Sequence, residues 1–315
     1  MNTTFLIVDG NAIMHRAFHA IPPFKTKAGI PTNIIYGFFG MVSRAIDVFT
    51  PGNLVIAFDT PKPTFREELL PSYQAHRPSI SDDFKVQIPL LKELLDVSGM
   101  CRMELDGYEA DDIIGTLSLQ ATKRGYQTYI FTGDRDIMQL VDAKTAIVSP
   151  QTGMSKIIMY DEAAVKEKMG VDPQFISDFK ALAGDPSDNY RGADGIGVKT
   201  AIQLVSEFGP VENLLNHIDD IEKPAVARRI KENREEIITS KRIATIVRDV
   251  PGIEFDEIHT AWSTFPDALR EKLEAYEMRT LVQRLYTKKP TPAVTTAYEP
   301  TVRATPPDSD QLGLF

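Results

Sequence analysis

Short apolar runs alternate with longer segments of helical periodicity in the first half of the chain. Apolar runs at residues 5–8, 54–58 and 128–131 have the length of buried strands. The segments between them repeat apolar side chains at helical spacing, and these segments are residues 34–49, 86–97 and 113–122. Strands that alternate with helices form a parallel sheet with helices on both faces. The pattern therefore predicts an α/β fold.

An acidic residue follows each of these apolar runs. Asp9 and Asp59 come directly after the first two runs, and Asp134 follows the third after Thr132 and Gly133. Ligands of such sheets bind outside the carboxyl ends of the strands. We therefore expect these three carboxylates to meet in one crevice.

Helical patterns replace the strand patterns after about residue 160. They cover residues 173–182, 199–208, 224–245 and 266–286. From residue 288 to 310 the composition shifts to Pro, Thr and Ala with little apolar periodicity, which indicates a disordered tail. The predicted domains are an α/β domain at residues 1–170, a helical subdomain at 171–287 and the tail at 288–315.

The composition indicates a cytoplasmic protein. The chain has 315 residues, of which 43% are hydrophobic, so it is long enough to bury a full core. No apolar run approaches the roughly 20 residues of a membrane-spanning helix, and no leader pattern precedes Phe5. A single cysteine, Cys101, excludes an internal disulfide. We expect a monomer with no membrane contact.

Further acidic residues cluster in short sequence motifs that predict a metal site. With the three acids above, the full set is Asp9, Asp59, Glu109, Asp111, Asp112, Asp134, Asp136, Asp185 and Asp188. Hard cations such as Mg²⁺ take carboxylate oxygens together with substrate phosphates. Each motif also has a simpler explanation, because acidic side chains stabilise a helix N-terminus and residues 185–189 fit a turn. Together they favour two Mg²⁺ ions, with Mn²⁺ as the alternative.

The net charge of −9 argues at first against a nucleic-acid partner, because such proteins carry basic patches. The nine predicted metal acids equal the whole excess of negative charge. Bound cations would cancel much of it, and the remaining surface could be locally basic.

Glycines open a predicted helix in the second half of the chain. Gly195 and Gly197 precede Lys199 and Thr200, so backbone N–H groups at the helix N-terminus are able to approach a phosphate. An ordinary helix-turn-helix with glycine turns is the other interpretation. The segment lacks the Rossmann and P-loop spacings, which disfavours a nucleotide cofactor.

A basic and aromatic stretch at residues 61–78 fits a single nucleic-acid strand. Arg66, His76 and Arg77 would contact phosphates, and Tyr73 would stack on a base. A solvated basic loop is the other interpretation.

Taken in order, these motifs resemble those of the flap endonuclease family. The similarity runs from about residue 4 to 286 and is strongest to the 5′-3′ exonuclease domain of bacterial DNA polymerase I, here in a stand-alone form. The matching motifs are Asp9-Gly10-Asn11 with Arg16-Ala17-Phe18, Phe58-Asp59 with Thr64-Phe65-Arg66, Gly107-Tyr108-Glu109-Ala110-Asp111-Asp112, Thr132-Gly133-Asp134, and Gly184-Asp185 with Ser187-Asp188-Asn189.

The resemblance implies a PIN-like nuclease fold, a helical arch at residues 61–83 and a helix-hairpin-helix at 192–200 with a bound monovalent ion such as K⁺. It assigns Asp9, Asp59, Glu109, Asp111 and Asp112 mainly to one divalent metal, and Asp134, Asp136, Asp185 and Asp188 mainly to the other. The implied catalytic residues are Arg66, Tyr73 and Arg77. The implied DNA-binding residues are Arg16, Lys62, Arg66, His76, Gly195, Gly197, Lys199 and Thr200.

Two features depart from the family pattern. Gln74 stands where the family usually has a lysine after the arch tyrosine, so a positive charge near the scissile phosphate is missing. The sequence also ends in an apolar cluster after the Pro-rich tail, and it resembles the peptide with which bacterial replication proteins bind the sliding clamp. Its contact residues would be Gln311, Leu312, Leu314 and Phe315.

The predicted function is a structure-specific 5′-3′ exonuclease and flap endonuclease acting on branched, nicked or 5′-flap DNA in primer removal and repair. It would work at the bacterial nucleoid with a sliding clamp and a separate DNA polymerase. The alternatives are a PIN-type ribonuclease and, because of Gln74, a catalytically weak protein that binds branched DNA.

Overall fold

The computed structural model describes residues 2–76, 79–150 and 157–287. These residues form two compact units, each described by itself. The sheet unit contains residues 2–65, 79–150, 157–177 and 245–287, and the helical unit contains residues 66–76 and 178–244. The residues after 287, which include the predicted clamp peptide, lie outside the described part.

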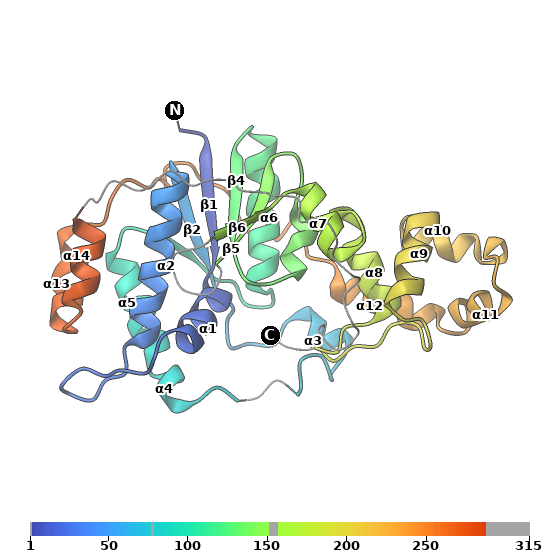
Figure 1. Cartoon of the computed structure of the whole chain (residues 1–315), viewed down its shortest axis with the longest axis horizontal. Helices are drawn as coiled ribbons and strands as arrows, with labels where there is room; N and C mark the ends of the chain where they lie inside the picture. The colour runs from blue at the N-terminus through green and yellow to red at the C-terminus, as the bar shows by residue number, and fades with distance from the viewer. Residues whose placement is uncertain (1, 77–78, 151–156, 288–315) are drawn as a thin grey trace. The chain divides into compact units, whose positions relative to one another are not determined.

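A six-stranded sheet forms the centre of the sheet unit (Figure 1). Its strands are β1 (Thr4–Asp9), β2 (Asn53–Ala57), β3 (Cys101–Met103), β4 (Gln127–Phe131), β5 (Thr145–Pro150) and β6 (Ile157–Tyr160), in the spatial order β3-β2-β1-β4-β5-β6. The first five strands run parallel, and β1, β2 and β4 among them are the three strands that the sequence pattern predicted. The prediction of a parallel sheet was wrong for β6, which runs antiparallel to β5. The short connection between these two strands explains the difference, because a parallel crossover needs a dozen residues or more.

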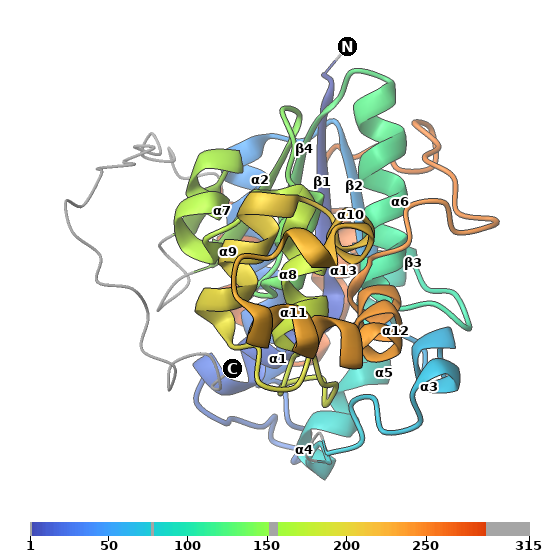
Figure 2. The same ribbon diagram turned by 90° about the vertical axis from the view of Figure 1, so that its right-hand side faces the viewer.

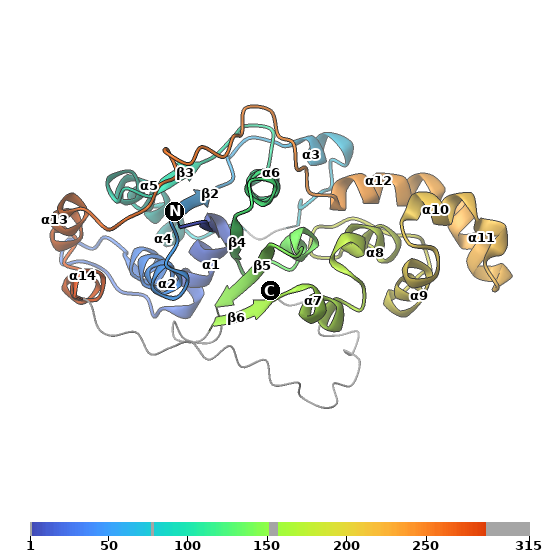
Figure 3. The same cartoon turned by 90° about the horizontal axis from the view of Figure 1, so that it is seen from above.

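Helices cover both faces of this sheet (Figure 3). Helices α1 (Gly10–Ala20), α2 (Asn33–Phe49) and α5 (Gln87–Val97) lie on one face, and α6 (Ala110–Lys123) lies on the other. Residues 5–8 of β1 are fully buried, so the central strand is apolar on both faces and shows no alternation. This packing holds the carboxyl ends of β1, β2 and β4 in fixed positions.

Two C-terminal helices also belong to the sheet unit. Helices α13 (Asp267–Ala275) and α14 (Arg279–Tyr286) place Leu269 and Leu281 in the same apolar core as α2 and α5. The sequence pattern predicted one helix here and assigned it to the helical subdomain. Glu277, with a left-handed φ of 60°, separates the two helices.

Short elements complete the sheet unit. They are α3 (Phe65–Leu69), which continues into the helical unit, α4 (Asp82–Lys85), the 3-10 turns η1 (Asp136–Leu140) and η2 (Pro173–Phe175), and α7 (Glu162–Met169). The predicted arch at residues 61–83 therefore contains two short helices, α3 and α4, among its described residues.

The helical unit consists of short helices (Figure 2). They are α8 (Ile176–Ala183), α9 (Val198–Phe208), α10 (Val211–Asn216), η3 (Ile218–Asp220), α11 (Pro224–Glu232) and α12 (Arg234–Ala244). The predicted helix at 224–245 is divided at Asn233, whose φ of −103° and ψ of 18° leave the helical range. Tyr73, Tyr190 and Ile243 pack together, which ties residues 66–76 to this unit. In neither unit is any described helix long and apolar enough to cross a membrane.

Candidate metal and active site

Five carboxylates of the sheet unit gather at the carboxyl edge of the sheet. Asp9 ends β1, Asp59 and Asp134 follow β2 and β4, and Glu109 and Asp111 lie at the N-terminus of α6. Burial raises the pKa of Asp111 well above its usual value, and the charges of Asp134, Asp9, Glu109 and Asp59 raise it further. The prediction that the strand-end acids Asp9, Asp59 and Asp134 meet is therefore confirmed within this unit, with Glu109 and Asp111 beside them.

Asp9 is the most enclosed member of the group. It is 3% exposed, and it caps α1 by accepting a hydrogen bond from the Ala12 N–H at 2.9 Å. The hydroxyl of Thr132 donates to its other oxygen at 2.6 Å. Burial and the nearby Asp59 raise the pKa of Asp9 to about 6, although these hydrogen bonds favour the charged form. Its orientation is thus fixed while its charge remains poorly compensated.

Asp59 is held from two directions. The side-chain amide of Asn11 donates to its Oδ2 at 2.7 Å, and the N–H of Ala110 donates to its Oδ1 at 2.7 Å. The N–H of Asp59 in turn donates to Asn11 Oδ1 at 3.2 Å. Asn11 belongs to the Asp9-Gly10-Asn11 motif, but the sequence alone assigned it no role.

Asp112 has a structural role at the start of α6. It is fully buried, and its two oxygens accept the N–H of Val247 at 2.9 Å and the N–H of Glu109 at 3.1 Å. Hydrogen bonds therefore fix the orientation of Asp112 as they fix those of Asp9 and Asp59, and its role as a metal ligand stays a prediction. Asp136 lies beside the group, and its N–H donates to Asp134 Oδ1 at 2.8 Å.

The remaining two predicted metal acids belong to the helical unit. Carboxylate oxygens of Asp185 and Asp188 lie within 4.8 Å of each other, and Asp185 forms a buried ion pair with Lys180. Burial raises the pKa of Asp185, but the charge of Lys180 and the hydrogen bonds from Ser187 outweigh it, so the net shift is downward. The approach of this pair to the acids of the sheet unit stays a prediction.

A tight backbone loop positions Asp185 and Asp188. The N–H of Asp185 donates to the Tyr190 carbonyl, and the N–H of Tyr190 donates back to the Asp185 carbonyl. A Cβ at Gly192 would lie 2.2 Å from the carbonyl oxygen of Leu182, so only glycine fits where the loop closes.

Two predicted arch residues are buried in the helical unit. Arg66 is 2% exposed and donates from Nε to the Ile243 carbonyl at 2.9 Å, and Tyr73 is 6% exposed. Both side chains would have to leave this packing to contact a DNA strand, so the structure corrects the expectation that they are presented to solvent. His76 is exposed, while Arg77 lies outside the described residues.

Other predicted DNA contacts lie on accessible surface. Lys62 is exposed and pairs with Asp106 at 2.6 Å, and Arg16 is half-buried on α1. In the hairpin, Gly195, Gly197 and Lys199 are exposed and Thr200 is half-buried. Gly197 is the N-cap of α9, which places the helix N-terminus where the sequence predicted it.

Arg229 supports the hairpin turn and was missed by sequence reasoning. Gly195 has a left-handed φ of 72°, and its carbonyl accepts a hydrogen bond from the Arg229 guanidinium. The two residues are 34 positions apart, so no local sequence signal links them.

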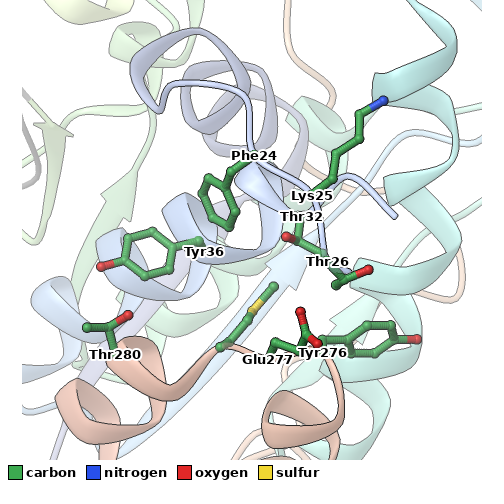
Figure 4. Close-up of a pocket in the computed structure, with 9 residues that line it drawn as sticks. Phe24, Lys25, Thr26, Thr32, Tyr36, Tyr276, Glu277 and Thr280 are labelled. Atoms are coloured by element: carbon green, nitrogen blue, oxygen red, sulfur yellow. The ribbon is translucent and has the colours of Figure 1, made fainter. Parts of the chain in front are cut away.

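A separate pocket of about 340 Å³ lies in the sheet unit, between the segment before α2 and the turn that joins α13 to α14 (Figure 4). Phe24, Tyr36 and Tyr276 contribute aromatic rings to its lining. None of the predicted site residues lines it, so it is distinct from the carboxylate group.

The donor set of the sheet unit fits hard divalent cations. Carboxylate oxygens are the ligands that Mg²⁺ and Mn²⁺ prefer, and burial together with neighbouring carboxylates raises the pKa values of Asp9 and Asp111, so a bound cation would favour their charged forms. A carboxylate group at the carboxyl edge of an α/β sheet fits the class of metal-dependent α/β enzymes that act on phosphate esters.

Family models assign the chain within that class. The model described as "5′-3′ exonuclease, N-terminal resolvase-like domain" matches residues 4–170, and the model described as "5′-3′ exonuclease, C-terminal SAM fold" matches residues 171–268. The chain therefore belongs to the 5′-3′ exonuclease family, which confirms the resemblance seen in the sequence.

Two relatives illustrate the similarity. A 5′-3′ exonuclease of Aquifex aeolicus is 36% identical over 284 residues, which cover 90% of this chain and 95% of the relative. DNA polymerase I of Mycobacterium bovis is 35% identical over 285 residues, which cover 90% of this chain and 31% of the relative. The chain thus spans about a third of the length of the DNA polymerase I relatives that it matches.

Solved structures share the fold at low sequence identity. A T5 5′-exonuclease with bound zinc ions has a TM-score of 0.67 and 19% identity, with 89% of this chain and 99% of that chain covered. The catalytic core of Rad2 in complex with a DNA substrate has a TM-score of 0.59 and 17% identity, with 90% and 91% covered.

Proposed function

We propose that the protein is a divalent-metal-dependent 5′-3′ exonuclease and flap endonuclease that hydrolyses phosphodiester bonds in branched, nicked or 5′-flap DNA. The observation that carries this proposal is the group of five carboxylates at the carboxyl edge of the sheet, where burial and neighbouring carboxylates raise the pKa values of Asp9 and Asp111. Family membership supports it. The biological setting would be primer removal and DNA repair at the bacterial nucleoid, beside a separate DNA polymerase.

In this proposal the chain's acids hold two Mg²⁺ ions, which Mn²⁺ is able to replace. Asp9, Asp59, Glu109, Asp111 and Asp112 would serve mainly one ion, and Asp134, Asp136, Asp185 and Asp188 would serve mainly the other. The chemistry that such ions supply is activation of a water and stabilisation of the leaving oxygen. Hydrogen bonds from Thr132, Asn11 and Ala110 keep two of the carboxylates oriented before any substrate arrives.

DNA binding is proposed for the surface around the α9 N-terminus. The N–H groups near Gly197 and the charge of Lys199 suit a phosphate, and a K⁺ ion at the hairpin would add positive charge. Lys62, His76 and Arg16 would contact the strand that carries the 5′ end. Because such contacts release counterions from DNA, affinity should fall steeply as salt concentration rises.

A cleavage assay tests the proposed activity. A labelled 5′-flap duplex with Mg²⁺ should be cut near the branch, and EDTA should stop the reaction. An Asp134→Ala preparation controls for contaminating nuclease. No cleavage above that control would refute the proposal, and preferential cutting of single-stranded RNA would favour the ribonuclease alternative.

Gln74 supports a second candidate, a protein that binds branched DNA with little turnover. Its side chain cannot supply the charge that a lysine would bring, and its φ of 53° places it in a strained turn. If the wild type binds the flap duplex without cutting it, Gln74→Lys should restore cleavage. Efficient cleavage by the wild type excludes this candidate.

Recruitment by a sliding clamp is proposed from the sequence of residues 311–315, which lie outside the described part. Leu312, Leu314 and Phe315 would fill an apolar pocket of the clamp. Deleting residues 311–315 should leave cleavage of short oligonucleotides unchanged and reduce clamp affinity at least about tenfold, which is ~1.4 kcal/mol. Surface plasmon resonance on immobilised clamp measures this, and equal affinity of the two proteins would refute the idea.

A further inference from the structure

The hydroxyl of Thr132 connects two of the proposed metal acids. Its Oγ1 donates to Asp9 Oδ2 at 2.6 Å and accepts the N–H of Asp134 at 2.9 Å. Asp9 ends β1 and Asp134 follows β4, so one side-chain oxygen joins the ends of two neighbouring strands. The proposed function uses only the bond from Thr132 to Asp9, and the bond from Asp134 adds a second link.

The surroundings of Thr132 leave its hydroxyl little freedom. The residue is fully buried, and its own N–H donates to the Val148 carbonyl at 3.0 Å, which fixes the backbone against β5. A hydroxyl has one proton, and here it goes to the carboxylate of Asp9, so the N–H of Asp134 meets a lone pair. Each bond therefore fixes the direction of the other.

We propose that Thr132 is a positioning residue that sets the relative orientation of Asp9 and Asp134 and thereby the affinity of the site for divalent metal. This inference rests on the proposed function, because it requires both acids to serve a metal site. Groups that orient ligating carboxylates by hydrogen bonds typically change metal affinity or activity by 10- to 100-fold when they are removed. Thr132 would act through these acids without contacting substrate.

Metal binding by the Thr132→Val protein tests the inference. Valine keeps the shape of threonine but neither donates to Asp9 nor accepts from Asp134. In titrations with MgCl₂ followed by calorimetry, we expect its dissociation constant for Mg²⁺ to rise roughly 10- to 100-fold. Cleavage should be lost at low Mg²⁺ and largely recover at saturating Mg²⁺, and Thr132→Ser should bind Mg²⁺ as the wild type does.

Thr128→Val is the matched control. Thr128 lies on β4, the strand that Thr132 follows, and is also fully buried, but its hydroxyl has no hydrogen-bond partner among the residues that the structure describes. The same substitution there removes no bond to the acids, so Mg²⁺ affinity should not change. Thr132→Ser and Thr132→Ala form a second pair that differs by the hydroxyl alone, which keeps the test decisive if the valine variant fails to fold.

The outcomes separate this inference from the proposed function. Equal Mg²⁺ affinity of the wild type and Thr132→Val, or of Thr132→Ser and Thr132→Ala, overturns the positioning role alone. An equal loss in Thr128→Val also overturns it. Failure of the wild type to bind Mg²⁺ overturns the proposed metal site together with the inference.

Discussion

Replacing Asp111 with asparagine is expected to lower nuclease activity at least about a hundredfold and to raise the melting temperature of the metal-free protein. Asp111 lies among four other carboxylates, and both burial and their charges raise its pKa. Asparagine retains the size and removes the charge. The substitution therefore relieves the charge repulsion that destabilises the folded metal-free protein. It also removes a carboxylate oxygen that would bind metal. Function and stability should change in opposite directions.

The stability effect has a defined pH dependence. The pKa of Asp111 is higher in the folded than in the unfolded chain, so ionising this group destabilises the folded state. The cost is greatest at high pH, where the melting temperature of the variant should exceed that of the wild type most. As the pH falls through the pKa of Asp111 in the folded chain and towards 4, the wild-type carboxyl is protonated. The difference in melting temperature between the variant and the wild type should then vanish. Thermal melts in EDTA at several pH values measure this.

A matched charge removal separates local from global effects. Asp219→Asn removes the same charge at an exposed position of the helical unit, so it should change neither activity nor the pH dependence of the melt. If Asp111→Asn melts at or below the wild-type temperature at pH 8 in EDTA, charge crowding in the metal-free site is refuted. Addition of Mg²⁺ should stabilise the wild type and leave this variant nearly unaffected.

The parts of the fold that the sequence predicted are those with strong local signals. The apolar runs that became β1, β2 and β4 are long and buried, and each leads into an acid. β3 has three half-buried residues, and β6 exposes Ile158 and Met159, so neither carries a clear strand pattern. The helix breaks at Asn233 and Glu277 involve neither glycine nor proline, which is why continuous helices were predicted.

The site was predictable by residue type but not by orientation. Asp111 and Asp112 are neighbours on α6, and successive helical residues point about 100° apart. In the structure Asp111 lies in the acid group, whereas the oxygens of Asp112 accept the N–H groups of Val247 and Glu109. Thr132 and Asn11 belong to motifs that the sequence analysis identified, but their hydrogen bonds join segments that are distant in sequence. Such partners follow from the three-dimensional packing alone.

Replacing Lys241 with methionine is expected to destabilise the helical unit by about 3–5 kcal/mol. Its ammonium pairs with Asp178, which is 1% exposed and also accepts the Val211 N–H at 2.8 Å. Methionine fills the volume but leaves a buried carboxylate without its cation. Asp178 joins α8, α10 and α12 through these bonds, so the loss should spread through the unit. Urea unfolding at pH 7, followed by circular dichroism, measures it.

Two further variants decide whether the lost charge pair is the cause. Asp178→Asn combined with Lys241→Met removes both charges and should recover part of the stability, because no unpaired buried charge remains. Arg228→Met breaks an exposed helix pair with Glu232 and should cost less than about 0.5 kcal/mol. If Lys241→Met costs no more than Arg228→Met, the ion pair does not stabilise the unit. If the double variant is as unstable as the single one, lost side-chain packing is the better explanation, because the buried charge is then gone.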